Sequence, residues 1–506
     1  MLETLGSLAT GFEIALQPQF LAYAFAGCVI GTLVGMLPGL GPLAGISLLL
    51  PGTFGLSPTA ALIMLAGVYY GAMYGGSTTS ILMRIPGEAA SVMTCIDGYA
   101  MTQKGRGGAA LAIAAIGSFI AGTLSVVGLM LLAPPLAEFA IRFGPAEYAS
   151  LLVVGLIVLA YMSGSSMPKM LAMAALGLLC GMIGMDVMTG YARFTGDVIA
   201  LRDGLGIVPV AVGLFGISEI ILSAAKAREV SVRQPKLREL VPTGAELKAS
   251  VGPIARGSVL GFLIGIIPGS AHIISSFVSY GIERRLSKTP ERFGSGAVEG
   301  VAGPESANNA AASGAFVPML ALGVPSGPIP AVMLAAIMIH GVIPGPLLIA
   351  ERPEIFWGFI ASMYVGNVVL LLLNLPLVGI FIQVLRIPYR YLYPLILTLC
   401  VIGVYAVGQS VVDIWIMIAM GFLGYGMRKL GYEPAPLVLG MVIAPLLELS
   451  FRQSLALSGG SYSIFVARPV SAALLALALV LLALSVRTAL TQRADWRQRL
   501  GLEERG

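Results

Sequence analysis

Two runs of small polar residues lie within otherwise apolar sequence, one in each half of the chain. The first contains Ser77, Thr78 and Thr79, and the second contains Asn308 and Asn309. Hydroxyl and amide groups offer donors to an anion and oxygen ligands to a sodium ion. Two adjacent amides in apolar surroundings are costly unless they are satisfied, so Asn308 and Asn309 are the strongest pair. For any single Gly, Ser or Thr here, the alternative role is close helix packing.

Turns containing Pro, Gly and Ser accompany both runs and are expected to break helices. The first N–H groups of a helix have no internal partner and lie at the positive end of its dipole. A carboxylate can be held there without a buried Lys or Arg. We therefore predict a substrate site formed by Gly39, Gly41, Ser77, Thr78, Thr79, Gly269, Ser270, Asn308, Asn309, Pro325 and Ser326. Four of these residues are also predicted ligands of a coupling ion, namely Ser77, Thr78, Asn308 and Asn309.

Few ionisable residues accompany the polar runs, and each has two interpretations. Arg84 either extends its charge to the membrane interface or meets a substrate carboxylate. Glu88, Asp97 and Glu305 are either proton or cation sites, or solvated residues near the ends of membrane segments.

Histidine and cysteine show no metal-binding pattern. The two histidines, His272 and His340, are expected to be neutral and packed. The cysteines are too scattered for a metal site or a disulfide framework; they are Cys28, Cys95, Cys180 and Cys400. We predict no cofactor and no metal ion beyond a coupling sodium.

The composition places the chain in a membrane. Of its 506 residues 57% are hydrophobic and 11% are charged, whereas a soluble domain carries about 25% charged residues. The net charge of +5 is concentrated in short loops, which indicates the positive-inside pattern and not nucleic-acid binding. No Lys or Arg precedes Arg84, so the first apolar span is not expected to be a cleaved signal peptide.

A membrane-spanning helix needs roughly 20 apolar residues. Candidate spans are 20–37, 58–73, 108–133, 146–162, 168–186, 207–225, 254–282, 329–349, 355–384, 391–408, 411–427, 435–450 and 469–486. Three apolar stretches are too interrupted to span simply, and we predict re-entrant hairpins or unwound helix segments over 38–57, 75–96 and 304–328.

The second half of the chain repeats the first. Gly31–Gly39 reappears as Gly261–Gly269, an offset of 230, and Gly75 with Pro86 reappears as Gly314 with Pro325, an offset of 239. A third block, at an offset of 244, matches Tyr161, Gly164 and Gly177 to Tyr405, Gly408 and Gly421. Three blocks in the same order indicate a duplication.

Charge placement predicts that the two copies have opposite orientations. The loop 283–292 is rich in Arg and Lys, whereas the matching loop 51–58 has no charge. Because Lys and Arg mark cytoplasmic loops, matching loops fall on opposite sides. The predicted organisation is a first membrane repeat at 1–225, a cytoplasmic linker at 226–252, a second repeat at 253–468, and an extra helix with a basic tail at 469–506. Inverted repeats with broken helices are typical of secondary transporters.

A family resemblance is carried by the blocks Gly35–Pro42, Tyr74–Ser80 with Ile85–Glu88, Asp97–Tyr99, Ser276–Tyr280, Glu299–Ala312, His340–Pro346, and Phe451–Ser454 with Leu457–Gly460. At these blocks the chain closely resembles the large membrane subunit of the tripartite tricarboxylate transporters, the TctA type.

The resemblance implies an all-α, elevator-like secondary transporter of the bacterial inner membrane. It implies a small four-helix membrane subunit (TctB type), a periplasmic solute-binding protein (TctC type) that delivers a carboxylate, and uptake driven by sodium or protons. The chain departs from the family pattern at Arg84, His272 and Val324–Pro328, so citrate itself is not implied, and dicarboxylates or aromatic carboxylates remain open.

Two other functions compete with transport. An intramembrane hydrolase would use Ser270 with His272 or His340, but Ser270 and His272, two positions apart, face different sides of a helix. A passive anion channel would need neither a delivery protein nor an ion gradient. We predict a transporter and not an enzyme.

Overall fold

The structure is a computed structural model that describes residues 2–37, 40–162, 167–186, 188–196, 198–224, 237–269, 271–384 and 389–499. Several residues named above lie outside the described residues, namely Pro38, Gly39, Gly164, Ser270, linker residues 226–236 and the tail beyond 499.

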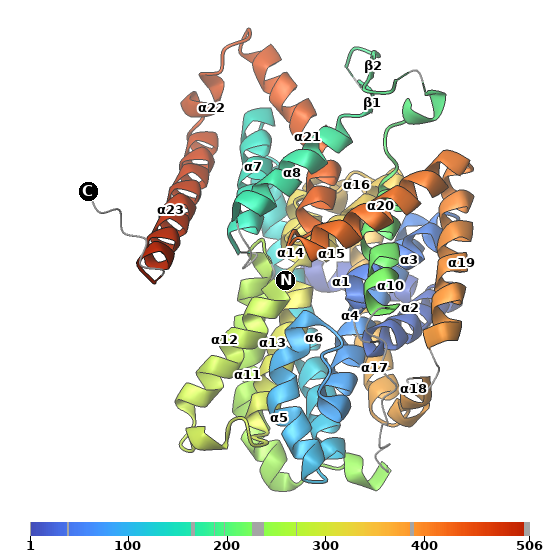
Figure 1. The fold of residues 1–506 in the computed structure, drawn as a ribbon, viewed down its shortest axis with the longest axis vertical. Helices are drawn as coiled ribbons and strands as arrows, with labels where there is room; N and C mark the ends of the chain where they lie inside the picture. The colour runs from blue at the N-terminus through green and yellow to red at the C-terminus, as the bar shows by residue number, and fades with distance from the viewer. Residues whose placement is uncertain are drawn as a thin grey trace.

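Helices dominate both halves of the chain (Figure 1). The first half forms α1 (Leu2–Ala15), α2 (Pro18–Met36), α3 (Gly41–Leu49), η1 (Leu50–Thr53), α4 (Pro58–Met83), η2 (Ala89–Ser91), α5 (Val92–Gln103), α6 (Gly107–Ala140), α7 (Pro145–Met162), α8 (Met167–Gly181), β1 (Gly184–Met185), β2 (Ala192–Arg193), η3 (Ile199–Leu201), α9 (Ile207–Ala211), the π-helix η4 (Val212–Ile217) and α10 (Ser218–Ala224). The second half forms η5 (Leu237–Leu240), α11 (Gly244–Ile266), α12 (Ala271–Leu286), η6 (Pro290–Arg292), α13 (Glu299–Gly314), α14 (Phe316–Leu322), α15 (Pro328–Ile339), α16 (Leu347–Glu351), α17 (Pro353–Asn374), α18 (Val378–Val384), α19 (Tyr389–Gly408), α20 (Val411–Lys429), α21 (Ala435–Leu457), α22 (Ile464–Ala467) and α23 (Pro469–Arg499).

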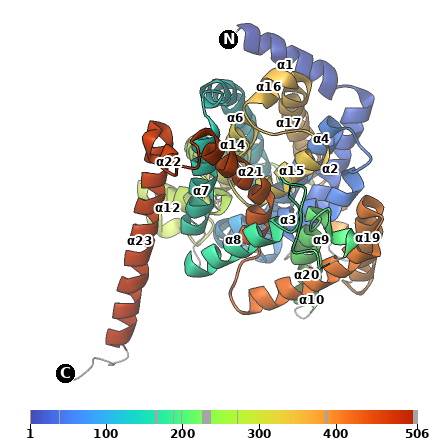
Figure 2. The ribbon, with the colours of Figure 1, turned by 90° about the horizontal axis from the view of Figure 1, so that it is seen from above.

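The prediction of an all-α membrane protein is confirmed. Within the described residues, six helices are long and apolar enough to cross a membrane, and seven shorter helices are also apolar. Helices suit this setting because they satisfy every backbone polar group internally, away from water. The only sheet in the described residues is a short antiparallel pair, in which Gly184 lies opposite Arg193. Helices α1 and α23 lie at the periphery of the bundle (Figure 2).

Glycines hold two helix pairs, α2 with α4 and α11 with α13, in close contact. A Cβ added at Gly31 would lie 2.4 Å from the carbonyl oxygen of Val68, and one at Gly261 would lie 2.2 Å from that of Ala307. The two glycines are 230 positions apart in the sequence, and the two carbonyl residues are 239 positions apart. These are the two offsets found between the halves of the sequence. The same shifts relate Gly27–Met64 to Gly257–Gly303, Gly35–Ala72 to Gly265–Ala311, and Gly75–Thr32 to Gly314–Phe262.

Helices α4 and α13 lie side by side and run antiparallel. The hydroxyls of Tyr70 and Ser313 are 3.1 Å apart, and Ser77 Oγ lies 2.5 Å from Glu305 Oε2. Moving forward along α4 from 70 to 77 therefore means moving backward along α13 from 313 to 305.

The predicted irregular segments 75–96 and 304–328 each contain helices on both sides of a short break, at 84–88 and 323–327, so the backbone is unwound only at these breaks. Residues 75–83 continue α4, and residues 304–314 belong to α13. Their Gly, Ser and Ala residues let neighbouring helices approach closely while the backbone stays paired. Conversely, the predicted span 254–282 is split, because α11 ends at Ile266 and α12 begins at Ala271. Near the Pro- and Gly-containing turns predicted to break helices, the described non-helical residues are Leu37, 84–88, 267–269 and 323–327.

An ion-pair network holds the loop that carries β1 and β2 against the end of α21. Arg452 donates to both carboxylate oxygens of Asp186, at 2.8 and 2.9 Å. Arg193 and Arg452 both donate to Glu448. The hydrogen bonds from Arg452 and from the Met188 N–H lower the pKa of Asp186 below its usual range.

Candidate functional site

A buried cluster of carboxyl, amide and hydroxyl groups lies where α4, α5, η2 and α13 meet. Glu305 Oε2 accepts a hydrogen bond from Ser77 Oγ at 2.5 Å, and Glu305 Oε1 accepts one from the Thr94 hydroxyl. Asn308 Nδ2 donates to Glu88 Oε1 at 2.7 Å. Glu305 and Asn308 are each 1% exposed and Glu88 is 7% exposed. Segments more than 200 residues apart in the chain thus share one polar cluster.

Helix α13 supplies one side of this cluster because of its residue spacing. Glu305 and Asn308 are three positions apart, which places them on the same face of a helix. Asn309 is turned toward α6, where its Nδ2 donates to Ser118 Oγ at 2.7 Å. Residues 300–314 are all buried, so water does not satisfy the polar side chains of this stretch and a missing partner inside the protein is costly.

Within the described ranges of the chain, the cluster has no basic partner. None of the ion pairs among the described residues includes Glu88 or Glu305. Arg84 is exposed, and its guanidinium lies 5.9 Å from the centroid of the Tyr99 ring. Two carboxyl groups therefore lie in the core with neutral donors only. An unpaired buried charge is expensive.

Two atoms of the cluster have no hydrogen-bond partner within the described part of the chain. They are Glu88 Oε2 and Asn308 Oδ1, and both are buried. Both are acceptors, so neither can satisfy the other without an added hydrogen or cation.

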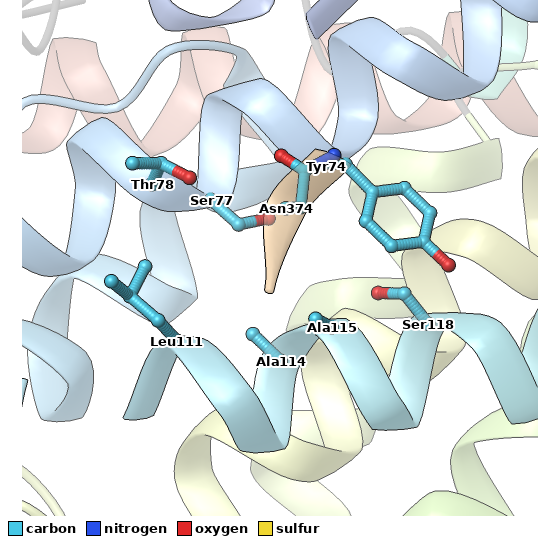
Figure 3. Close-up of a pocket in the computed structure, with 8 residues that line it drawn as sticks. All are labelled: Tyr74, Ser77, Thr78, Leu111, Ala114, Ala115, Ser118 and Asn374. Atoms are coloured by element: carbon cyan, nitrogen blue, oxygen red, sulfur yellow. The ribbon is translucent and has the colours of Figure 1, made fainter. Parts of the chain in front are cut away.

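A small cavity of about 10 Å³ lies beside the cluster, between α4, α6 and the end of α17 (Figure 3). This volume holds about one water molecule. Its lining residues are Tyr74, Ser77, Thr78, Leu111, Ala114, Ala115, Ser118 and Asn374. The Tyr74 hydroxyl and Asn374 Oδ1 have no described hydrogen-bond partner. The cavity thus combines oxygen ligands with room for a small occupant.

A second cavity of about 10 Å³ lies where two turns of the second half meet. Gly269 N donates to Ser326 O at 2.6 Å, and Ser326 Oγ donates to Ala315 O. In the first half, a Cβ added at Gly87 would lie 2.4 Å from the carbonyl oxygen of Gly35. In the first half, the break at 84–88 therefore packs against the end of α2, and in the second half the break at 323–327 packs against the turn that follows α11.

The predicted site residues fall into separate places. Ser77 and Asn308 join the carboxyl cluster, and Ser77 and Thr78 line the cavity of Figure 3. Asn309 donates to Ser118, and Gly269 and Ser326 line the second cavity.

The remaining predicted residues make fewer contacts. Thr79 donates to Gly76 O within its own helix, Pro325 is buried, and Gly41 begins α3 with φ +62°. A Cβ at Gly41 would meet nothing within 4 Å. The two other predicted residues, Gly39 and Ser270, lie outside the described residues. The structure does not gather the predicted residues into a single pocket.

Sequence reasoning left the roles of three acids open, and their positions differ. Glu88 and Glu305 are buried in the cluster, not solvated at segment ends. Asp97 holds the loop before α13, because it accepts hydrogen bonds from Tyr280 Oη and from the N–H groups of Gly294, Gly296 and Ala297. The signal for Glu305 was its place in a run of small residues, 300–314, that contains no other charge.

Comparison with known proteins identifies the family. The model of the "Tripartite tricarboxylate transporter TctA family" matches residues 21–439. An uncharacterised 52.8 kDa protein from the TAR-I ttuC' 3' region of Agrobacterium vitis is 46% identical over 497 residues, which is 98% of this chain and 99% of the relative. An uncharacterised protein from the TAR-II ttuC' 3' region of the same organism is 46% identical over 235 residues, 46% of this chain and 97% of the relative. No solved structure matches the chain. The chain belongs to the TctA family of tripartite tricarboxylate transporters.

Proposed function

We propose that this chain carries small di- or tricarboxylates across the bacterial inner membrane, driven by a sodium or proton gradient. TctA proteins are transporter subunits and not enzymes, which removes the hydrolase alternative. The observation that carries the proposal is family membership together with a polar cluster that is buried in the helix bundle and has no described ion pair. The proposed partners are a four-helix TctB-type membrane subunit and a periplasmic TctC-type binding protein.

Two inverted repeats, 1–225 and 253–468, are the proposed framework for transport. Two observations support this arrangement. Glycine contacts recur at constant offsets between α2–α4 and α11–α13. The equivalent helices α4 and α13 run antiparallel, as a two-fold axis in the membrane plane requires.

The proposed carboxylate site lies at the breaks before α12 and α15. The first N–H groups of these helices lack partners within the helix and attract an anion. The cavity lined by Gly269 and Ser326 holds about one water molecule, so a carboxylate can enter only when these turns separate. An elevator-like movement of one part of the bundle against the rest would provide that separation.

The proposed coupling-ion site uses Ser77, Thr78, Asn308 and Asn309. Ser77 and Thr78 line the cavity of Figure 3, and Asn309 donates to the Ser118 hydroxyl on its wall. Asn308 binds Glu88. An ion bound here would contact α4 and α13 together, so its binding would depend on how the two repeats are arranged.

The test begins with the delivery protein. A thermal-shift screen of the cognate binding protein against di-, tri- and aromatic carboxylates identifies the ligand. That ligand, radiolabelled, is then offered to proteoliposomes that contain this chain and its small subunit. We expect accumulation only with the binding protein present and a sodium or proton gradient imposed. Equal uptake without either would favour a passive channel and refute the proposal.

A further inference from the structure

The pair formed by Glu88 and Asn308 lacks one hydrogen. Asn308 Nδ2 donates to Glu88 Oε1 at 2.7 Å, while Glu88 Oε2 and Asn308 Oδ1 are both buried acceptors without a described partner. A carboxyl group and an amide can form two hydrogen bonds with each other when the carboxyl is protonated. A proton on Oε2 supplies the donor that this pair lacks.

Glu305 differs from Glu88 in how its oxygens are satisfied. Both Glu305 oxygens accept hydrogen bonds, from the Ser77 and Thr94 hydroxyls. A carboxylate that accepts hydrogen bonds at both oxygens is the better stabilised anion. Among the described residues, Asn308 is the side chain that donates to Glu88, and Glu88 Oε2 stays unpaired. Two nearby buried carboxylates cannot both stay ionised at low cost, so the proton belongs on Glu88.

No basic side chain among the described residues forms an ion pair with Glu88 in place of that proton. Tyr69 of α4 and Glu305 of α13 are the titratable groups that act on it electrostatically. The other charged or titratable residues on the elements packed against η2 are Tyr70, Tyr74 and Arg84 of α4 and its cap, Cys95, Asp97 and Tyr99 of α5, His272, Tyr280, Glu283, Arg284 and Arg285 of α12, and Glu299 of α13. Among the described contacts, Arg284 and Arg285 make no ion pair with Glu88, and the Arg84 guanidinium lies over the Tyr99 ring. Asp97 accepts hydrogen bonds from four other donors.

We propose that Glu88 and Asn308 form a proton-binding site, in which protonation of Glu88 Oε2 completes a cyclic acid–amide pair between the first and second halves of the chain. Binding adds one proton, leaves a single negative charge on Glu305, and joins η2 to α13 through two hydrogen bonds. Loss of the proton restores two buried negative charges and weakens that connection. The role of this proton in coupling rests on the proposed transport function, whereas its binding does not.

Infrared spectroscopy of the full chain in lipid nanodiscs tests the site without any substrate. We expect a carboxylic-acid C=O band that disappears as the pH is raised. The band should be lost in Glu88→Gln, kept in Glu305→Gln, and unchanged in the exposed control Glu13→Gln. Asn308→Ala should shift the band, because the acid loses its hydrogen-bond partner while Glu88 stays in place. Carboxyl-labelled glutamate in the wild-type protein should shift the same band, which assigns it to glutamate even where Glu88→Gln does not fold.

Three results would overturn the proposal: no protonated glutamate band at a pH of about 6, where exposed glutamates are ionised, a band there that survives Glu88→Gln, or a band that Asn308→Ala leaves unmoved. Replacing choline chloride by sodium chloride at constant pH should leave the band intact, and its loss would assign the site to sodium instead. If the band behaves as expected but carboxylate uptake fails, the proton site stands and the proposed transport function falls.

Discussion

Ser77 Oγ donates to Glu305 Oε2 over 2.5 Å and so joins the first half of the chain to the second across 228 positions of sequence. Ser77 lies on α4, near its C-terminal end, and Glu305 lies in the first half of α13. Because these are equivalent helices of the two halves, any movement of one half against the other must stretch or break this hydrogen bond.

Removing the hydrogen-bond donors of the cluster should strongly reduce uptake without changing insertion of the protein into the membrane. Ser77→Ala leaves Glu305 with one described side-chain donor, and Asn308→Ala leaves Glu88 with no described side-chain donor. An unsatisfied buried group costs about 1–3 kcal/mol, and about 1.4 kcal/mol corresponds to a tenfold change. We therefore expect uptake to fall about tenfold or more in each variant, measured in proteoliposomes, while membrane yield stays unchanged. Thr398→Ala, on an exposed surface of α19, is the control, and wild-type rates in both site variants would refute the site assignment.

Alanine at the glycine contacts should destabilise the bundle. A Cβ at Gly31 or Gly261 would lie 2.4 or 2.2 Å from a backbone carbonyl oxygen, so the paired helices must separate. Overpacking of this kind costs about 1–3 kcal/mol. We expect lower melting temperatures for Gly31→Ala and Gly261→Ala, measured by thermal unfolding in detergent. Gly281→Ala, where a Cβ meets nothing within 4 Å, should melt like the wild type, and equal melting of all three variants would contradict the close packing.

The loop that carries β1 and β2 should loosen in acid. Arg452 lowers the pKa of Asp186 in the folded protein. The ion pair is therefore fully formed at pH values above the ordinary Asp pKa of about 4. It is lost as the pH falls toward the lower pKa of the folded state. Limited proteolysis should cut within 184–203 faster at acid pH in the wild type, and already at neutral pH in Asp186→Asn. Asp203→Asn, at an exposed position, serves as the control. Protection of the Asp186→Asn loop at neutral pH would show that the network does not hold it.

Matching loops of the two halves should lie on opposite sides of the membrane. In a variant with its four cysteines replaced by alanine, Gly55→Cys should react with an impermeant maleimide added outside the cell. Lys288→Cys should react only after the inner membrane is opened. Both positions are exposed, so access depends on the side of the membrane and not on burial. Labelling of both from the same side would rule out inverted repeats.

The membrane class and the family could be inferred from the sequence, because each depends on composition or on local order, and the sequence also predicts a duplication. Charge scarcity, the repeated Gly and Pro positions and the long Glu299–Ala312 block are visible without coordinates. The two predicted offsets, 230 and 239, reappear in the glycine contacts, where small residues at matching positions approach a backbone carbonyl.

The helical state of the polar runs and the burial of the acids needed the tertiary structure. Gly, Ser and Asn at 75–80 and 304–309 suggested broken backbone, but close neighbours make the helix the favoured state, since its backbone groups are satisfied internally. Glu88 and Glu305 lie 217 positions apart, and each alone is compatible with a solvated segment end. Whether a carboxyl group is buried depends on which distant helices cover it, and so only the packing of α4, α5 and α13 decided that both acids share one buried cluster.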